Sequence, residues 1–66
     1  MKDINVNGVR ITRQTAHMGT AECDGSLFCW EALDSGLEIF DENHLHPTEE
    51  ELSRLVPAIT QALETP

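Results

Sequence analysis

The clearest pattern near the start of the chain is an alternation of apolar and polar residues over 4–12, on either side of Asn7-Gly8. Asn-Gly between two alternating runs is the strongest short-range signal for a two-residue β-hairpin loop. Such a loop puts four apolar side chains on one face of the hairpin. The predicted pairs are Val6 with Val9 and Ile4 with Ile11. We therefore expect an N-terminal hairpin, with one continuous strand bulged at Gly8 as the alternative.

A second pair of apolar runs, 27–33 and 37–40, lies on either side of Asp34-Ser35-Gly36. Gly36 can supply the left-handed backbone position that a three-residue hairpin loop needs. These runs, rich in aromatic and β-compatible residues, predict a second hairpin. The alternative is a short helix capped by Asp24 or Ser26 and ended at Gly36, because a short apolar run is compatible with either period.

A three-residue loop would bring all three aromatic residues of the chain to one face of this second hairpin. The predicted pairs are Leu33 with Leu37, Glu31 with Ile39, Trp30 with Phe40 and Phe28 with Glu42. The opposite face is apolar as well, and one helix is too little to cover both. We therefore expect a surface for partner binding or self-association, with the aromatic residues as ordinary core as the alternative. Its residues are Phe28, Trp30 and Phe40, with Glu38 and Glu42 at the rim.

The segment 14–26 is polar, carries Gly19 and Gly25 and shows no sustained period. It predicts the tail of a strand followed by a loop.

The C-terminal segment predicts one amphipathic helix. Thr48 with Glu51 three positions later forms a capping box, and Pro47 can pack against Leu52. Pro57 should bend this helix without dividing it. The predicted core-facing stripe is Leu52, Leu55, Val56, Ile59, Ala62 and Leu63. The sequence thus predicts a single small α+β domain over 1–66, in which an antiparallel sheet of about two hairpins precedes one Pro-kinked C-terminal helix packed on the sheet.

Acidic residues dominate the composition, with twelve Asp and Glu against four Lys and Arg and a formal net charge of −8. Residues 20–66 carry eleven of the acids and one base, Arg54. Such a charge disfavours direct binding to nucleic acid and to anionic membranes, because both would be repelled. It favours a basic protein partner. In one form of this hypothesis the acidic surface imitates the phosphate charges of DNA and so binds a basic DNA-binding protein. The simplest alternative is that the acids only keep a small protein soluble.

Two cysteines and two histidines offer the softer ligands that zinc prefers, and they are Cys23, Cys29, His44 and His46. His44 and His46 would lie on one side of an extended segment. Five residues separate the cysteines, whereas a zinc knuckle usually brings them two to four apart. A small metal-binding protein is therefore the alternative function. With only two cysteines and no apolar leader segment, we expect a cytoplasmic protein with free thiols.

Catalysis has less support, since no Gly-rich phosphate loop or nucleophile elbow occurs in the chain. The residue types permit a thiol–imidazole pair of Cys23 or Cys29 with His17, and they also permit paired carboxylates. Among twelve acidic residues, however, two carboxylates will lie near each other by chance. We therefore expect no enzyme and no cofactor. The prediction is a small acidic protein-binding module that acts as an adaptor, inhibitor or regulator of a larger protein. Association of the module into a homodimer is left open.

Overall fold

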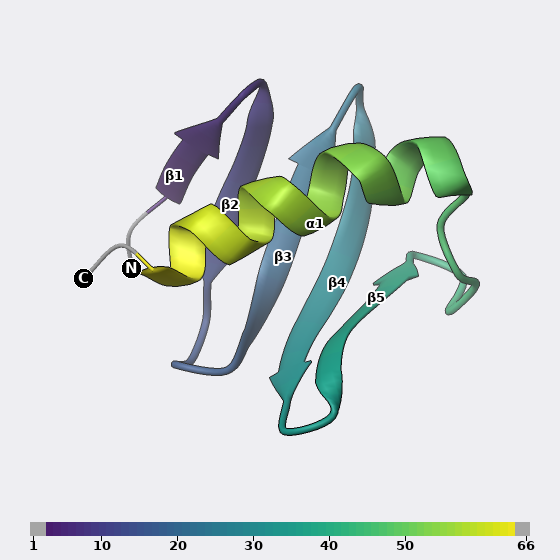
Figure 1. The fold of residues 1–66 in the computed structure, drawn as a ribbon. Coiled ribbons are helices and arrows are strands. Elements are labelled where there is room, and N and C mark those ends of the chain that lie inside the picture. The colour runs from purple at the N-terminus through teal and green to yellow at the C-terminus, as the bar shows by residue number, and fades with distance from the viewer. Residues whose placement is uncertain (1–2, 65–66) are drawn as a thin grey trace.

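A five-stranded antiparallel sheet carries one helix across one of its faces, which is the predicted α+β arrangement (Figure 1). The computed structural model describes residues 3–64. The strands stand in the sheet in chain order, so each strand pairs with the next. The elements are β1 (Asp3–Val6), β2 (Val9–Arg13), β3 (Met18–Cys23), β4 (Ser26–Leu33), β5 (Gly36–Asp41) and α1 (Glu49–Glu64).

The N-terminal hairpin of β1 and β2 is confirmed with its predicted register. Its pairs are Ile4 with Ile11 and Val6 with Val9. Asn7 and Gly8 have φ of 52° and 84°, the two left-handed positions that a type I′ turn requires. The alternative of one bulged strand is therefore wrong.

The prediction of a loop over 14–26 is wrong, because 18–23 form β3, a central strand of the sheet. The inward-facing residues of β3 are small, namely Gly19, Ala21 and Cys23, so the strand lacks the large alternating side chains by which strands are usually found. Asp24 and Gly25 form a second two-residue turn, with φ of 52° and 80°. Asp-Gly is itself a hairpin signal.

The second hairpin exists, but its predicted register is wrong by one residue. The turn is Asp34-Ser35, and the observed pairs are Leu33 with Gly36, Ala32 with Leu37, Trp30 with Ile39, Cys29 with Phe40 and Phe28 with Asp41. A one-residue shift exchanges the two faces of a strand. The predicted register would point Glu38 into the core, where an unpaired carboxylate is costly. The observed register instead turns Ile39 inward, at 4% exposure.

The C-terminal segment forms the predicted helix as one continuous element that contains Pro57, while the bend at Pro57 stays a prediction. Both hydrogen bonds of the capping box are present. The backbone N–H of Glu51 donates to Thr48 Oγ1 at 3.2 Å, and the N–H of Thr48 donates to Glu51 Oε1 at 2.8 Å. One stripe position is wrong: Val56 is 40% exposed, and Ala58, at 1%, is buried instead.

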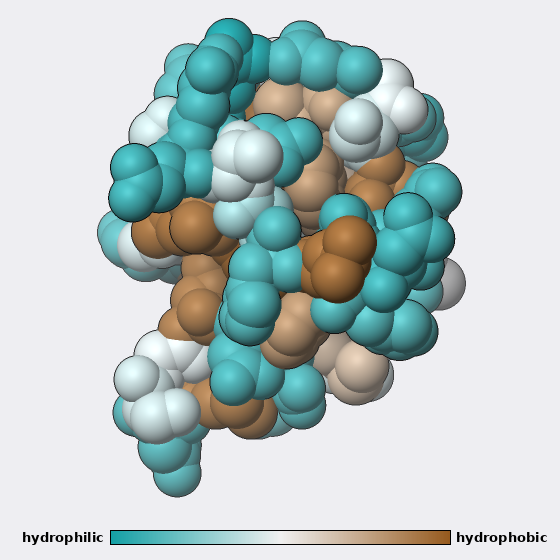
Figure 2. Space-filling view, turned by 90° about the vertical axis from the view of Figure 1, so that its right-hand side faces the viewer, coloured by the Kyte–Doolittle hydropathy of each residue, from teal (hydrophilic) through white to brown (hydrophobic). Residues whose placement is uncertain are grey.

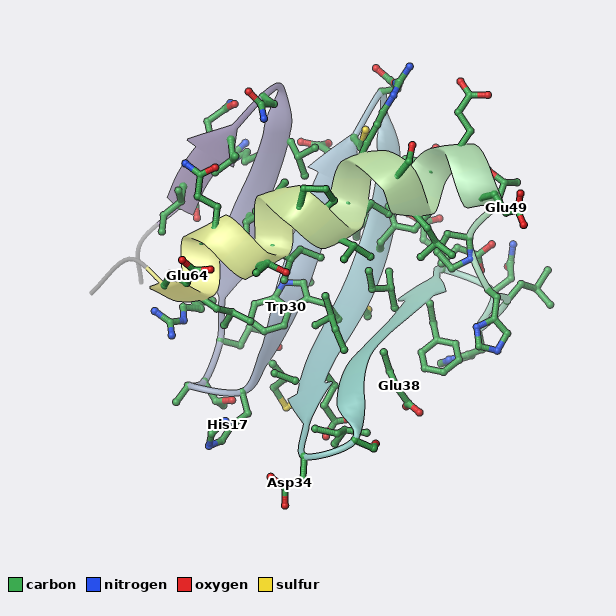
Figure 3. All side chains as sticks on the ribbon, viewed as in Figure 1. His17, Trp30, Asp34, Glu38, Glu49 and Glu64 are labelled. Atoms are coloured by element: carbon green, nitrogen blue, oxygen red, sulfur yellow. The ribbon has the colours of Figure 1, made fainter. Side chains whose placement is uncertain are left out.

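The core lies between α1 and the sheet, with α1 packed mainly on β1, β2 and β3. Trp30 lies beneath α1, between the helix and the sheet (Figure 3). The largest fully buried side chains are Trp30, Phe28, Ile11, Leu55, Ile59 and Val9. The four strand residues in this list, Trp30, Phe28, Ile11 and Val9, all lie on the face of the sheet that α1 covers.

Replacing Thr48 with Ala is expected to lower the free energy of unfolding by about 1 kcal/mol, the usual cost of losing an N-cap side chain. The variant leaves the Glu51 N–H without its acceptor and removes one half of the capping box. Urea unfolding followed by Trp30 fluorescence measures the change. Thr60→Ala, at an exposed position within the same helix, is the control. A loss no larger than that of the control would mean that the cap does not hold the start of the helix.

Candidate functional site

The structure separates the three aromatic residues that the sequence places on one surface. Phe28 and Trp30 face α1 and are each 2% exposed, and Trp30 Nε1 donates a hydrogen bond to the Thr20 carbonyl at 3.0 Å. Phe40 points to the opposite face of the sheet, and its ring centroid lies 5.1 Å from that of His46. A partner reaches Phe28 or Trp30 only by opening the core. The predicted grouping of the three aromatic residues is therefore wrong, and Phe28 and Trp30 belong to the core.

The face of the sheet opposite α1, which we call the open face, carries no helix or strand from residues 3–64. One row across it joins four strands and consists of Thr12, Thr20, Cys29 and Phe40. Large apolar side chains lie on either side of this row. They are Met18, Leu27 and Leu33, each 40–42% exposed, and they are three of the five large apolar residues that stand exposed in the described chain. The open face thus carries exposed apolar side chains among polar ones. No helix or strand of residues 3–64 covers it, although His46 from the loop after β5 packs against Phe40.

A shallow hollow of about 160 Å³ lies over this row. The open-face residues around it are Met18, Thr20, Cys29, Glu31 and Phe40. Its size suits one or two side chains of a partner rather than a substrate that must be enclosed. Viewed from the β5 side of the molecule, apolar residues break through the polar surface in several separate places (Figure 2).

Carboxylates border the open face. Glu31 and Glu38 are cross-strand partners on β4 and β5 and both are exposed. Among residues 3–64 neither carboxylate makes an ion pair or a side-chain hydrogen bond. Like charges directly opposite one another on a sheet are destabilising. Glu42, the second predicted rim residue, is exposed just after β5. This part of the face is therefore negatively charged and lacks a neutralising base of its own among the described residues.

The other end of the same face is neutralised. Arg10 Nη2 lies 2.6 Å from Asp3 Oδ2, and Thr12 Oγ1 donates to Asp3 Oδ1 at 2.9 Å. The hydrogen bonds from Arg10 and then from Thr12 hold the pKa of Asp3 below its ordinary value. A lowered folded-state pKa stabilises the fold at higher pH, and this contribution is lost as the pH falls below the ordinary aspartate range.

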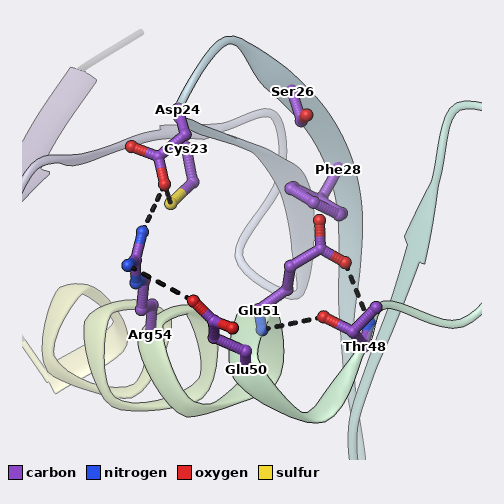
Figure 4. A pocket seen from close by; sticks show the side chains of 8 residues that line it. All are labelled: Cys23, Asp24, Ser26, Phe28, Thr48, Glu50, Glu51 and Arg54. Carbon is purple, nitrogen blue, oxygen red and sulfur yellow. Dashed lines mark hydrogen bonds and ion pairs between the residues drawn. The ribbon is translucent and has the colours of Figure 1, made fainter.

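A second pocket, of about 300 Å³, lies where α1 begins beside the β3–β4 turn (Figure 4). Arg54 from α1 forms ion pairs with Asp24 in the turn and with Glu50, whose Oε1 is 3.7 Å from Arg54 Nη2. Cys23 and then Asp24 raise the pKa of Arg54, and arginine is protonated at neutral pH in any case. Because its ionic groups pair with one another, this pocket ties the helix to the sheet.

The four candidate zinc ligands are not brought together. Cys23 points to the α1 side of the sheet and Cys29 to the open face, so one metal ion cannot bind both thiols. His46 packs against Phe40, and His44 lies in the loop after β5. Within residues 3–64 no three Cys, His, Asp or Glu side chains are grouped as metal ligands would be.

The candidate thiol–imidazole pair is separated as well. The His17 carbonyl accepts a hydrogen bond from the Ala32 N–H, three residues along β4 from Cys29. At about 3.3 Å per residue this places the two backbones roughly 10 Å apart. Cys23 lies at the far end of β3 from His17. The described geometry therefore brings neither thiol to His17.

Added NaCl near neutral pH is expected to raise the melting temperature by several degrees, because salt screens repulsion among acids that have few basic neighbours. Calorimetry between roughly 0.05 and 0.5 M NaCl measures the effect, because the Debye length shortens strongly over this range. The double variant Glu31→Gln, Glu38→Gln should melt higher at low salt and respond less to NaCl. A flat response in both proteins would show that the carboxylates are too dispersed to interact.

Comparison with protein-family models, with curated proteins and with solved structures finds no match for the chain. Within the described part of the chain, the single helix is neither long enough nor apolar enough to cross a bilayer. Evidence on function therefore comes from the chain's own surfaces.

Sequence reasoning missed most of the open face. It identified Phe40 and Glu38 but assigned them to the same surface as two core residues. Alternation along the second hairpin does predict that Leu27, Cys29 and Leu33 share a face, but the opposite face was chosen as the binding surface. Met18 and Thr20 were missed because they lie on β3, which was predicted as a loop.

Proposed function

We propose that this protein is a small acidic protein-binding module that acts as an adaptor, inhibitor or regulator of a larger protein with a basic surface. The observation that carries the proposal is the open face, where exposed apolar side chains stand beside the Glu31 and Glu38 carboxylates, which have no ion-pair partner among residues 3–64. Large exposed apolar groups rimmed by charge are typical of interaction surfaces. The formal net charge of −8 favours rapid association with a basic partner.

The proposal places the protein in the cytoplasm. Its support is that Cys23 and Cys29 are both free thiols on opposite faces of the sheet, and so they cannot form a disulfide with each other. The alternative of a small zinc protein loses its shared site for the same reason.

The function is tested by capturing partners from the native cell with tagged protein and then rebuilding the complex from purified components. We expect a discrete partner with a basic surface, whose affinity falls as NaCl rises. Failure to rebuild any complex from purified proteins would contradict the proposal. Stoichiometric zinc in untagged protein, purified without chelator, would favour the metal-binding alternative instead.

A further inference from the structure

We propose that the open face is the docking surface and that its occupant is a basic amphipathic segment of a partner protein. In this complex a Lys or Arg of the segment lies between Glu31 and Glu38, while its apolar side chains cover Leu27, Cys29 and Phe40. The inference rests on the proposed function and adds which surface binds and the chemistry of what it binds.

The apolar part of the face determines where the partner sits. The row of Thr20, Cys29 and Phe40 crosses the centre of the sheet, and the hollow above it leaves room for inserted side chains. The described chain measures 28 × 26 × 18 Å, so its broadest side has an outline of about 700 Å². A standard interface buries about 800 Å² on each partner. The open face is therefore large enough to be most of one interface.

The charges on the face determine the occupant. Glu31 and Glu38 stand directly opposite each other with no cation between them among residues 3–64. This repulsion costs the free protein stability, and a cation placed between the two carboxylates removes it. A Lys or Arg beside apolar side chains supplies both the charge and the contact area.

A second copy of the chain fits this surface poorly. A two-fold interface buries the same patch of both copies, so it would bring the Glu31 and Glu38 carboxylates of both copies into one interface. Each copy also carries a formal charge of −8, which repels the other at neutral pH. Anionic membranes are disfavoured for the same electrostatic reason. The charges thus select a basic partner over both.

Cys29 provides a direct reporter, because it is the exposed thiol near the centre of the face whereas Cys23 is only 8% exposed. The variant Cys23→Ala leaves Cys29 as the sole thiol. The probe is a synthetic amphipathic peptide of Lys and Leu, and the control is the same peptide with Glu in place of Lys. We expect the basic peptide to slow alkylation of Cys29 by iodoacetamide at least tenfold and the acidic peptide to leave it unchanged.

The charge requirement is tested with two double variants of equal net charge. Glu31→Gln, Glu38→Gln should weaken peptide binding about tenfold or more, a loss in the range measured for charge pairs across interfaces. The control Glu49→Gln, Glu64→Gln changes the two ends of α1, which Figure 3 places in the helix layer rather than on the open face. This control should weaken peptide binding less than about twofold. Because the first variant removes repulsion, it should melt at a higher temperature than the original protein, so lost binding cannot reflect unfolding.

Equal weakening by the two double variants, or alkylation of Cys29 that the basic peptide does not slow, would overturn the inference. A partner that rebuilds into a complex yet binds equally well to the Glu31→Gln, Glu38→Gln variant would overturn it while leaving the proposed function intact. Protection of Cys29 in the free protein that grows with its concentration, together with a dimer in sedimentation, would assign the face to a second copy.

Discussion

Replacing Phe28 with Ala is expected to remove a large part of the free energy that keeps the protein folded. Truncating a buried phenylalanine costs about 3–5 kcal/mol, because both the hydrophobic contacts and the packing are lost. A chain of 66 residues has a total stability of roughly 3–10 kcal/mol at 0.05–0.15 kcal/mol per residue. The side chain is 2% exposed beneath α1, so its deletion removes the contacts of a fully buried ring. Far-ultraviolet circular dichroism and the emission of Trp30 report the outcome.

Phe40→Ala is the matched control, since it deletes the same side chain from the other face of the sheet. Phe40 is half-buried and contacts His46, so its loss should cost about 1 kcal/mol, a part of the full burial of an aromatic side chain. The milder pair Phe28→Leu and Phe40→Leu keeps both proteins folded for urea titration. Equal losses at the two positions would contradict the observed register, which places the two side chains on opposite faces of the sheet.

Local signals in the sequence were sufficient for those elements whose ends carry specific chemistry. Asn7-Gly8 determined both the turn and the register of the first hairpin, because a two-residue I′ loop leaves one way to pair its strands. Thr48 and Glu51 determined where α1 begins, and both of their predicted hydrogen bonds are present. In each case the information lies within a few residues of the feature that it predicts.

The register of the second hairpin could not be read in the same way. Gly36 has a φ of 136°, a value that few other residues adopt, and a glycine of this kind suggested a three-residue loop. In the structure Gly36 is instead the first residue of β5, paired with Leu33. What selects the register is the burial of Ile39 beside Trp30 and the exposure of Glu38, and this depends on which face α1 covers. That is tertiary information, and the candidate site depended on it.

Strand β3 was missed because its inward residues are small. The small size of the residue at position 19 is explained by the neighbouring strand β4. Trp30 on β4 is the cross-strand partner of Gly19 on β3. The large ring fills the space that a side chain at position 19 would otherwise occupy. A glycine that looked like a loop signal is thus a packing requirement inside a sheet.

Gly19→Ala is accordingly expected to destabilise the fold by about 3 kcal/mol, the upper end of the usual range for overpacking a core. A Cβ at this position would collide with the backbone carbonyl oxygen of Thr12 and lie 2.8 Å from Trp30 Cζ2. The contact with Thr12 involves backbone within the β2–β3 ladder, so rotation of a side chain cannot relieve it.

Urea unfolding measures this loss, and Trp30 emission should shift to longer wavelength in the folded state as the indole is displaced from the core. Thr20→Ala, the next residue in β3, points to the open face and serves as the control, with an expected change below about 1 kcal/mol. Alanine ordinarily stabilises a strand relative to glycine by roughly 0.5–1 kcal/mol, because glycine loses more backbone entropy on folding. A loss of stability in Gly19→Ala therefore supports the packing of Trp30 over position 19, and a gain contradicts it. A stabilised Gly19→Ala variant would mean that Trp30 does not pack over position 19 and that β3 does not hold the central place in the sheet described above.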